Sequence, residues 1–162
     1  MTNSTTKTVS RLIISILACE AAGGIGAIFT TSVIPTWYAA LQKPSFTPPN
    51  WLFGPAWVTL YLLMGIAVFL VWQKGLDTPG VRSSLGVFLI QLVLNISWSI
   101  IFFGAKSLLG GVVIIVALWL AILWTILKLF RISVTAGWLM LPYILWVSFA
   151  SALNISVWML NS

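Results

Sequence analysis

Polar side chains that could bind a ligand recur at helical spacing within one apolar stretch. At i, i+4, i+7 and i+8 stand Gln91, Asn95, Trp98 and Ser99. On a helix these four residues share one face. Uncompensated amides are costly in hydrocarbon, so this face must look inward. There the amides either hydrogen-bond to neighbouring helices or line a cavity that holds the polar group of a ligand, and the spacing alone leaves both interpretations open.

A second face of the same kind occurs near the end of the chain. Its members are Trp146, Phe149, Ala150, Leu153 and Asn154. A large aromatic residue, a small residue and an amide therefore share one side of a helix. A small residue between large ones is typical of a pocket, although ordinary knobs-into-holes packing gives the same pattern.

One of the two acids, Glu20, lies inside an apolar stretch, whereas the other, Asp77, lies between two stretches. An acid within the membrane is a functional hypothesis by default, because burying its charge is costly. The alternative is structural. Glu20 follows Arg11 by only a few helical turns, and a protonated or water-bridged carboxyl bound to a neighbouring helix would also explain it.

Several kinds of chemistry are excluded by what the sequence lacks. The chain has no His and a single Cys, Cys19, so neither a disulfide framework nor a Cys/His metal site can form. The net charge is +6, but the basic residues are scattered at the ends of apolar runs and form no stripe that could follow a phosphate backbone. We therefore expect no metal, no obligatory cofactor and no nucleic-acid partner.

The elements that position these residues must be membrane-spanning helices. Of the 162 residues, 60% are hydrophobic and 6% charged, whereas soluble domains carry about 25% charged residues. We place spans at 12–34, 51–73, 81–103, 108–130 and 134–160, each long enough to cross roughly 30 Å of hydrocarbon. The first run is too long for the apolar core of a signal peptide, so we expect it to be retained. The predicted fold is a single all-α domain, residues 1–162, containing five transmembrane helices.

The basic residues predict the orientation of this multi-pass protein. One side of the membrane would hold Lys7, Arg11, Lys74, Arg82, Lys128 and Arg131, and the other only Lys43 and Lys106. By the positive-inside rule the N-terminus is cytoplasmic and the C-terminus lies on the opposite side.

Residues 35–50 form a long structured loop between the first two spans. Four prolines, at positions 35, 44, 48 and 49, argue against a helix continuing through it. The loop also contains Trp37, Tyr38, Leu41 and Phe46. Such a segment either covers the mouth of a cavity as a lid or lies passively among the lipid headgroups, which attract Trp and Tyr for physical reasons alone.

Small residues in the first span provide a surface for close helix packing. Ala18, Ala22 and Gly26 recur every fourth residue, with Gly23 and Ala27 beside them. Such a ridge lets another helix backbone approach closely. We expect a helix contact here in preference to a ligand groove, and a homodimer is one hypothesis for its partner.

Three sequence motifs resemble those of the translocator protein and tryptophan-rich sensory protein (TspO/MBR) family. The run WYAALQKPSFTPPNW at 37–51, followed by FGPAWVTLY at 53–61, resembles the family's loop and second helix. The segment from Asn95 to Gly104 resembles its third-helix motif, and Leu141, Pro142, Tyr143 and Trp146 resemble the start of its fifth helix. The similarity covers nearly the whole chain beyond the N-terminal tail.

The resemblance implies a five-helix bundle, usually dimeric, that senses or regulates tetrapyrrole and stress metabolism. It also implies a cavity under the long loop that binds porphyrins such as protoporphyrin IX, haem and benzodiazepine-type ligands. Carried over to matched positions, the cavity would be lined by Ala27, Tyr38, Trp51, Phe53, Gly54, Trp57, Tyr61, Asn95, Trp98, Ser99, Trp146, Phe149 and Ala150. The faces that helical spacing selected independently belong to the same set.

The chain departs from the family pattern in two places. Animal members carry a cholesterol motif, a Tyr followed by a basic residue, at the end of the fifth helix. Here that region reads LNISVWM at 153–159, which argues against sterol binding by a motif that is weak even when intact. The family loop often has Trp where this chain has Phe46, which keeps the aromatic ring but loses an N–H donor.

Three functions fit these features to different degrees. The leading one is a membrane receptor or sensor that binds hydrophobic aromatic ligands, with lipid as its other partner. The alternative is an enzyme, because some bacterial relatives are described as degrading protoporphyrin in light through tryptophans that match Trp57 and Trp146. A transporter ranks last because no inverted repeat or Gly/Pro-broken helix pair is visible. Without His, haem would be held by stacking or weak ligation, which argues against a redox haem enzyme.

Overall fold

The computed structural model describes residues 2–162, and within them every regular element is helical. In chain order the elements are α1 (Thr2–Thr30), η1 (Ile34–Tyr38), η2 (Asn50–Leu52), α2 (Phe53–Trp72), α3 (Val81–Ser99), η3 (Ile100–Gly104), α4 (Leu108–Phe130), α5 (Val134–Leu139) and α6 (Leu141–Asn161). Five stretches are long and apolar enough to cross a bilayer. The predicted fold class, an all-α five-helix membrane protein, is confirmed.

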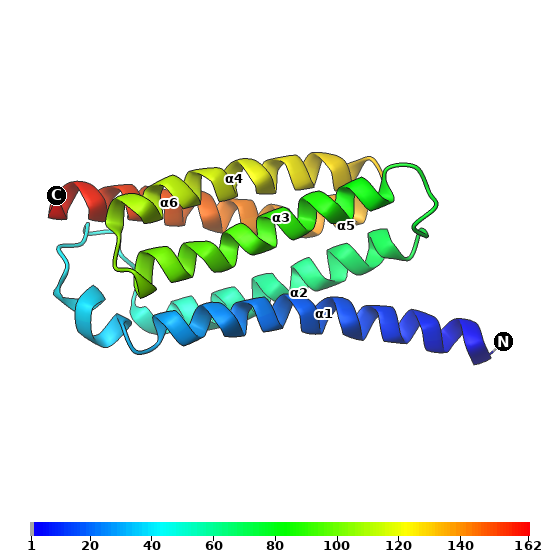
Figure 1. The fold of residues 1–162 in the computed structure, drawn as a ribbon, viewed down its shortest axis with the longest axis horizontal. Helices are drawn as coiled ribbons and strands as arrows, with labels where there is room; N and C mark the ends of the chain where they lie inside the picture. Colours follow the sequence, from blue (N-terminus) through cyan, green and yellow to red (C-terminus); the bar gives the residue numbers. More distant parts are fainter. Residues whose placement is uncertain (1) are drawn as a thin grey trace.

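The long helices lie side by side in an elongated bundle (Figure 1). The chain begins at one end and finishes at the other, and the loop between α1 and α2 lies at the end where α6 finishes. Helix α1 packs on α2 and α3, and α4 packs on α3 and α6, while the short α5 lies against α2 and α4. The ends of α1, α3 and α6 and the start of α2 therefore lie at the same end of the bundle as this loop.

The helix of the first span does not continue through the proline-rich segment, as expected, but the segment contains a short helix of its own. Helix α1 ends at Thr30, before the expected boundary at residue 34, and the π-helix η1 then begins at Ile34 with Pro35 in its first turn. Proline disrupts a helix interior, where its missing N–H is needed, but is accepted in the first turn. As a result, Tyr38 is held on a defined helical turn and is buried.

The last span, expected to be one helix over 134–160, is interrupted between α5 and α6 at Met140. Pro142 occupies the first turn of α6, and it cannot donate a backbone hydrogen bond to the carbonyl of Trp138 four residues earlier. The N–H of Met140 bonds instead to the carbonyl of Gly137, 3.2 Å away. Because of this interruption, α5 does not continue as part of α6. Helix α5 packs against α2 and α4.

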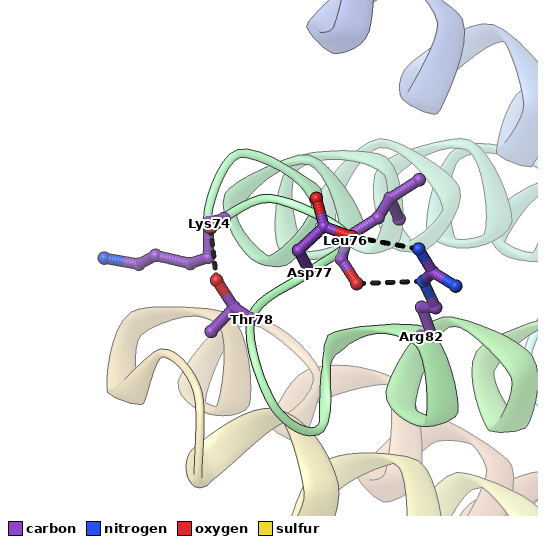
Figure 2. A network of polar contacts seen from close by, with 5 residues as sticks. All are labelled: Lys74, Leu76, Asp77, Thr78 and Arg82. Carbon is purple, nitrogen blue, oxygen red and sulfur yellow. Dashed lines mark hydrogen bonds and ion pairs between the residues drawn. The ribbon is translucent and has the colours of Figure 1, made fainter.

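The connection between α2 and α3, at the N-terminal end of the bundle, is ordered by local polar contacts (Figure 2). Arg82 Nε donates to the carbonyl of Leu76 at 3.0 Å, and Arg82 also pairs with Asp77 at 3.0 Å. Thr78 Oγ1 donates to the carbonyl of Lys74. Because both members of the ion pair are mostly exposed, it adds little stability, and its role is to shape the turn.

One polar side chain of α6 attaches the long loop to the bundle, and a second polar side chain orders the loop internally. The backbone N–H of Gln42 donates to Asn161 Oδ1 at 3.0 Å, and Asn161 Nδ2 donates back to the carbonyl of Gln42 at 2.8 Å. Within the loop, Lys43 Nζ donates to the carbonyls of Tyr38, Ala39 and Leu41 at 2.8 to 3.1 Å. These bonds satisfy carbonyls at the end of η1 and tie the loop to the last turn of α6.

The small-residue ridge of α1 packs inside the bundle. Ala22 and Gly26 are buried, and a Cβ added at Gly26 would lie 3.0 Å from Ser99 Oγ on α3. Ala18 and Ala27 are exposed, and Ala27 lines the cavity. A Cβ added at Gly23 would lie 2.5 Å from the ring of Tyr61 on α2. The buried residues of the ridge therefore pack against α2 and α3 of the same chain and give no argument for a dimer.

Candidate ligand-binding cavity

A cavity of about 590 Å³ lies among α1, α2, α3 and α6, beneath the long loop. This volume falls within the range of pockets for small organic ligands, about 300 to 1,000 Å³. Its walls are mainly aromatic and aliphatic, and its polar side chains are few. The loop contributes Ile34, Tyr38 and Asn50 to the lining, whereas Phe46 points outward and is exposed. The loop thus combines a partial lid with an outward-facing apolar surface.

The structure brings all but one of the sequence-predicted site residues to this cavity. The lining includes Ala27, Tyr38, Trp51, Phe53, Gly54, Trp57, Tyr61, Asn95, Trp98, Ser99, Trp146 and Ala150. The exception is Phe149, whose ring lies behind the wall, 6.1 Å from Phe46 and 5.8 Å from Trp146 between ring centroids. Its placement in the lining was wrong, because Phe149 packs between the loop and Trp146 and supports the indole from outside the cavity.

Aromatic rings in face-to-face contact form one wall. Trp98 stacks on Phe102 with ring centroids 5.6 Å apart and planes 14° from parallel, and Trp57 stacks on Tyr61 at 5.7 Å. Trp57 and Trp98 lie 6.3 Å apart. Contacts of this kind add about 0.5 to 1.5 kcal/mol each beyond the burial of area. They also place aromatic rings along the cavity lining, where a planar ligand could meet them.

The wide helical turn η3 extends this wall. It follows α3 directly and is closed by a bond from the N–H of Ala105 to the carbonyl of Ile100 at 2.8 Å. The turn contains two adjacent residues, Phe102 and Phe103. Both are buried, and their ring centroids lie 4.8 Å apart. Single π-turns often occur at functional sites, and this one lets neighbouring phenylalanines both face the aromatic cluster.

The amides of α3 bond to neighbouring helices, and one of them also reaches the cavity. Tyr61 Oη donates to Asn95 Oδ1 at 2.5 Å, Asn95 Nδ2 donates to Tyr143 Oη at 2.7 Å, and Tyr143 Oη donates to Gln91 Oε1 at 3.0 Å. This chain joins α2, α3 and α6 in the apolar interior. Asn95 thus both hydrogen-bonds to neighbouring helices and lines the cavity. Gln91 only hydrogen-bonds to a neighbouring helix, and Ser99 lines the cavity.

Three buried polar atoms of cavity-lining residues make no hydrogen bond to any residue that the structure describes. They are Trp98 Nε1, Trp146 Nε1 and Asn154 Oδ1. An unpaired buried polar atom costs about 1 to 3 kcal/mol, so such atoms gather where another molecule supplies the partner. Outside the spans, burial raises the pKa of the Tyr38 hydroxyl, which keeps this side chain neutral and able to donate a hydrogen bond.

Some lining residues were not anticipated from the sequence. Thr30 and Thr31 follow Ala27 at i+3 and i+4, so helical spacing could have found them, whereas the loop residue Asn50 gave no periodic signal. Gly23 and Gly26 were interpreted as packing positions, and they also border the cavity. Glycines serve both purposes, because the absence of a side chain allows helix contact and leaves space for a ligand.

Exposed lining residues lie along the seam between α1 and α2. These helices meet where a Cβ added at Gly65 would lie 2.6 Å from Ile16 and one added at Gly23 would lie 2.5 Å from Tyr61, but the lining residues Gly24 and Gly54 have nothing within 4 Å of an added Cβ. Val58, also in the lining, is 58% exposed. Because both helices span the apolar region, this seam faces the lipid acyl chains, and a hydrophobic ligand could reach the cavity directly from the bilayer.

Narrowing this seam is expected to slow ligand association. Replacing both Gly24 and Gly54 with leucine places side chains in space that is empty, so the fold should tolerate them. We expect the association rate of an aromatic ligand in lipid nanodiscs to fall about tenfold, with dissociation slowed as well. The matched control is Gly86→Leu on α3, which also meets nothing within 4 Å. Unchanged association in the double variant would place the entrance at the loop.

Comparison with known proteins decides the family. A model of the TspO/MBR family matches residues 15–159. The tryptophan-rich protein TspO of Archaeoglobus fulgidus is 46% identical over 155 residues, covering 95% of this chain and 99% of that protein. The translocator protein of Homo sapiens is 38% identical over 135 residues, covering 83% and 80%. The chain belongs to the TspO/MBR family.

Membership places this chain among membrane translocator and tryptophan-rich sensory proteins. One family member, the tryptophan-rich sensory protein of Cereibacter sphaeroides, is 33% identical over 144 residues, covering 89% of this chain and 87% of that protein. The region matched by the family model contains every residue that lines the cavity. The resemblance inferred from the loop and helix motifs is therefore confirmed, and the cavity lies in the part of the chain that the TspO/MBR family shares.

Proposed function

We propose that this protein is a membrane receptor or sensor that binds porphyrins, such as protoporphyrin IX and haem, and other hydrophobic aromatic molecules, including benzodiazepine-type ligands. Binding would regulate tetrapyrrole or stress responses. The observation that supports this proposal best is the cavity wall, where the ring centroid of Trp98 lies 6.3 Å from that of Trp57, in a tilted pair, and 5.6 Å from that of Phe102, in a stacked pair. Such a wall suits the flat face of a conjugated ring.

The polar groups at the cavity would orient such a ligand. Asn95 and Ser99 line the α3 side, and Tyr38 lies beneath the loop. The unpaired indole N–H groups of Trp98 and Trp146 could donate to a ligand after small ring rotations. The sequence offers no His, so haem would be retained by ring stacking and weak oxygen donors, and a porphyrin without iron should bind comparably well.

The proposed setting is a bilayer with the N-terminus on the cytoplasmic side. The starts of α1 and α3 and the ends of α2 and α4 share one end of the bundle, which gathers most of the basic residues there, as the positive-inside rule requires. A homodimer is proposed from the family resemblance. Exposed apolar residues of α1, among them Ile25 and Ile28, would provide a face for it. Cross-linking in lipid that detects only monomers would exclude the dimer.

The test is a titration of protein in lipid nanodiscs with protoporphyrin IX in the dark, followed by tryptophan quenching. We expect saturable binding that Trp57→Phe and Trp146→Phe each weaken several-fold, because both indoles line the cavity. The control is Trp124→Phe, whose ring is 52% exposed on α4 away from the cavity. Quenching that does not saturate, or that is unchanged by both cavity substitutions, would show that the porphyrin only partitions into the lipid.

A second candidate function is light-dependent degradation of the porphyrin. The observation that favours it is that Trp57 and Trp146, the matched indoles, line the same cavity although they contact different rings, Tyr61 and Phe53 respectively. Dissolved oxygen would be the oxidant and the porphyrin the group oxidised, and an indole that gave an electron to the light-excited ring would regain one as that ring is oxidised. Repeating the titration under illumination separates the two functions. Degradation of many porphyrin molecules per protein that requires both indoles would favour an enzyme. Loss of only about one porphyrin per protein would favour the receptor.

A further inference from the structure

Glu20 of α1 lines the cavity. It is the only acid within the five spans, and its side chain is partly exposed. Among the residues that the structure describes, its carboxyl group makes neither a hydrogen bond nor an ion pair. A direct bond from the carboxyl to a neighbouring helix, one form of the structural alternative, is therefore not made.

No basic side chain faces Glu20. Arg11, the nearest basic residue along α1, instead lies over the ring of Trp72 at 5.4 Å. The groups near Glu20 that could ionise are Cys19 of its own helix and Tyr61 of α2, and neither carries positive charge. The cavity lining contains no Lys or Arg. An intramembrane carboxylate without a counter-charge is costly, and such groups commonly pair with a cation.

The space beside Glu20 is open at Gly24 and bounded by an aromatic ring at Gly23. Both glycines line the cavity one turn further along α1, but a Cβ added at Gly24 would meet nothing within 4 Å, whereas one added at Gly23 would lie 2.5 Å from the ring of Tyr61. On α2, Tyr61 stacks on Trp57, with ring centroids 5.7 Å apart. The electron-rich faces of such rings attract cations, more strongly where water is excluded. A carboxylate and two aromatic rings thus border one region of the cavity.

We propose that Glu20 is the recognition group of a cationic subsite, and that the cavity prefers aromatic ligands that carry a protonated amine. The aromatic body would stack on Trp57 and Trp98, and the ammonium group would pair with Glu20. Anionic substituents would be repelled from this end and directed toward the loop. This inference rests on the proposed function, since it assigns a ligand class to the same cavity.

The experiment compares three probes that share one ring system, namely 1-pyrenemethylamine, its N-acetyl derivative and 1-pyreneacetate. Binding is measured by fluorescence in nanodiscs of uncharged phosphatidylcholine, with empty nanodiscs subtracted, so that a charged lipid surface cannot produce the preference. We expect the amine to bind the unmodified protein about tenfold more tightly than the neutral derivative, and the carboxylate to bind most weakly. In Glu20→Gln the amine and the neutral probe should differ by less than about twofold.

The matched control is Asp77→Asn, which removes one negative charge from the exposed turn between α2 and α3 and should leave the amine preference intact. An amine preference that is absent from the unmodified protein, or that survives Glu20→Gln, would overturn the cationic subsite. If the neutral probe still binds saturably in that case, the proposed receptor function stands. If none of the probes binds saturably, both proposals fail.

Discussion

Replacing Gly65 with leucine is expected to separate α1 from α2 and to lower the free energy of unfolding by about 3 kcal/mol or more. Gly65 is buried, and a Cβ added there would lie 2.6 Å from the Cα of Ile16 and 3.1 Å from its backbone nitrogen. A flexible side chain could move aside, but a helix backbone cannot. Relieving the clash requires α1 to shift as a unit, which would disturb its contacts with both α2 and α3.

Thermal unfolding in nanodiscs, followed by circular dichroism and tryptophan fluorescence, measures this effect. Gly86→Leu is the matched control, because it makes the same substitution within a long helix at a position with nothing within 4 Å. We expect a clear loss of thermal stability for Gly65→Leu and little change for Gly86→Leu. Equal unfolding temperatures would show that α1 and α2 are not held together at this crossing.

Replacing Ala150 with leucine should weaken the binding of protoporphyrin IX at least about tenfold while leaving the bundle folded. Ala150 lines the cavity from α6, beside Trp146 and Leu153. The added carbons would occupy space that the ligand needs. Because they enter an existing cavity and not a packed interior, the cost of overpacking should be small.

The control for this substitution is Ala152→Leu, two residues further along α6 on an exposed face. Both variants should unfold at nearly the temperature of the unmodified protein. In the dark titration only Ala150→Leu should lose affinity. Equal affinity in both variants would mean that the ligand binds elsewhere, whereas unfolding of Ala150→Leu would mean that the site is packed and not hollow.

Several features of this protein could be predicted from sequence because they depend on local patterns. The five spans follow from runs of apolar residues of sufficient length. The inward faces of α3 and α6 follow from helical spacing, since a residue such as Asn95 or Asn154 cannot face lipid unpaired. The proline-rich loop and the motif around Trp57 sufficed to indicate the family, which a match over residues 15–159 confirms.

The tertiary structure alone decided which partner each inward residue has. Helical spacing placed Gln91 and Asn95 on one face, but whether they bond to Tyr143 or border the cavity depends on the position of α6. The same holds for Phe149, which shares a face with Ala150 yet packs on Phe46 of the loop. Spacing gives the direction of a side chain from its own helix and says nothing about what lies there.

What the sequence by itself determined is that the chain is membrane-embedded, helical and a member of its family, because bilayer length, helical period and motif are properties of contiguous residues. Only the tertiary structure decided that the ridge on α1 meets α2 and α3 of the same chain and that Glu20 faces a cavity with no basic residue in its lining. Each of these outcomes depends on how distant helices cross. A crossing is set by the summed packing of many side chains, which no single stretch of sequence contains.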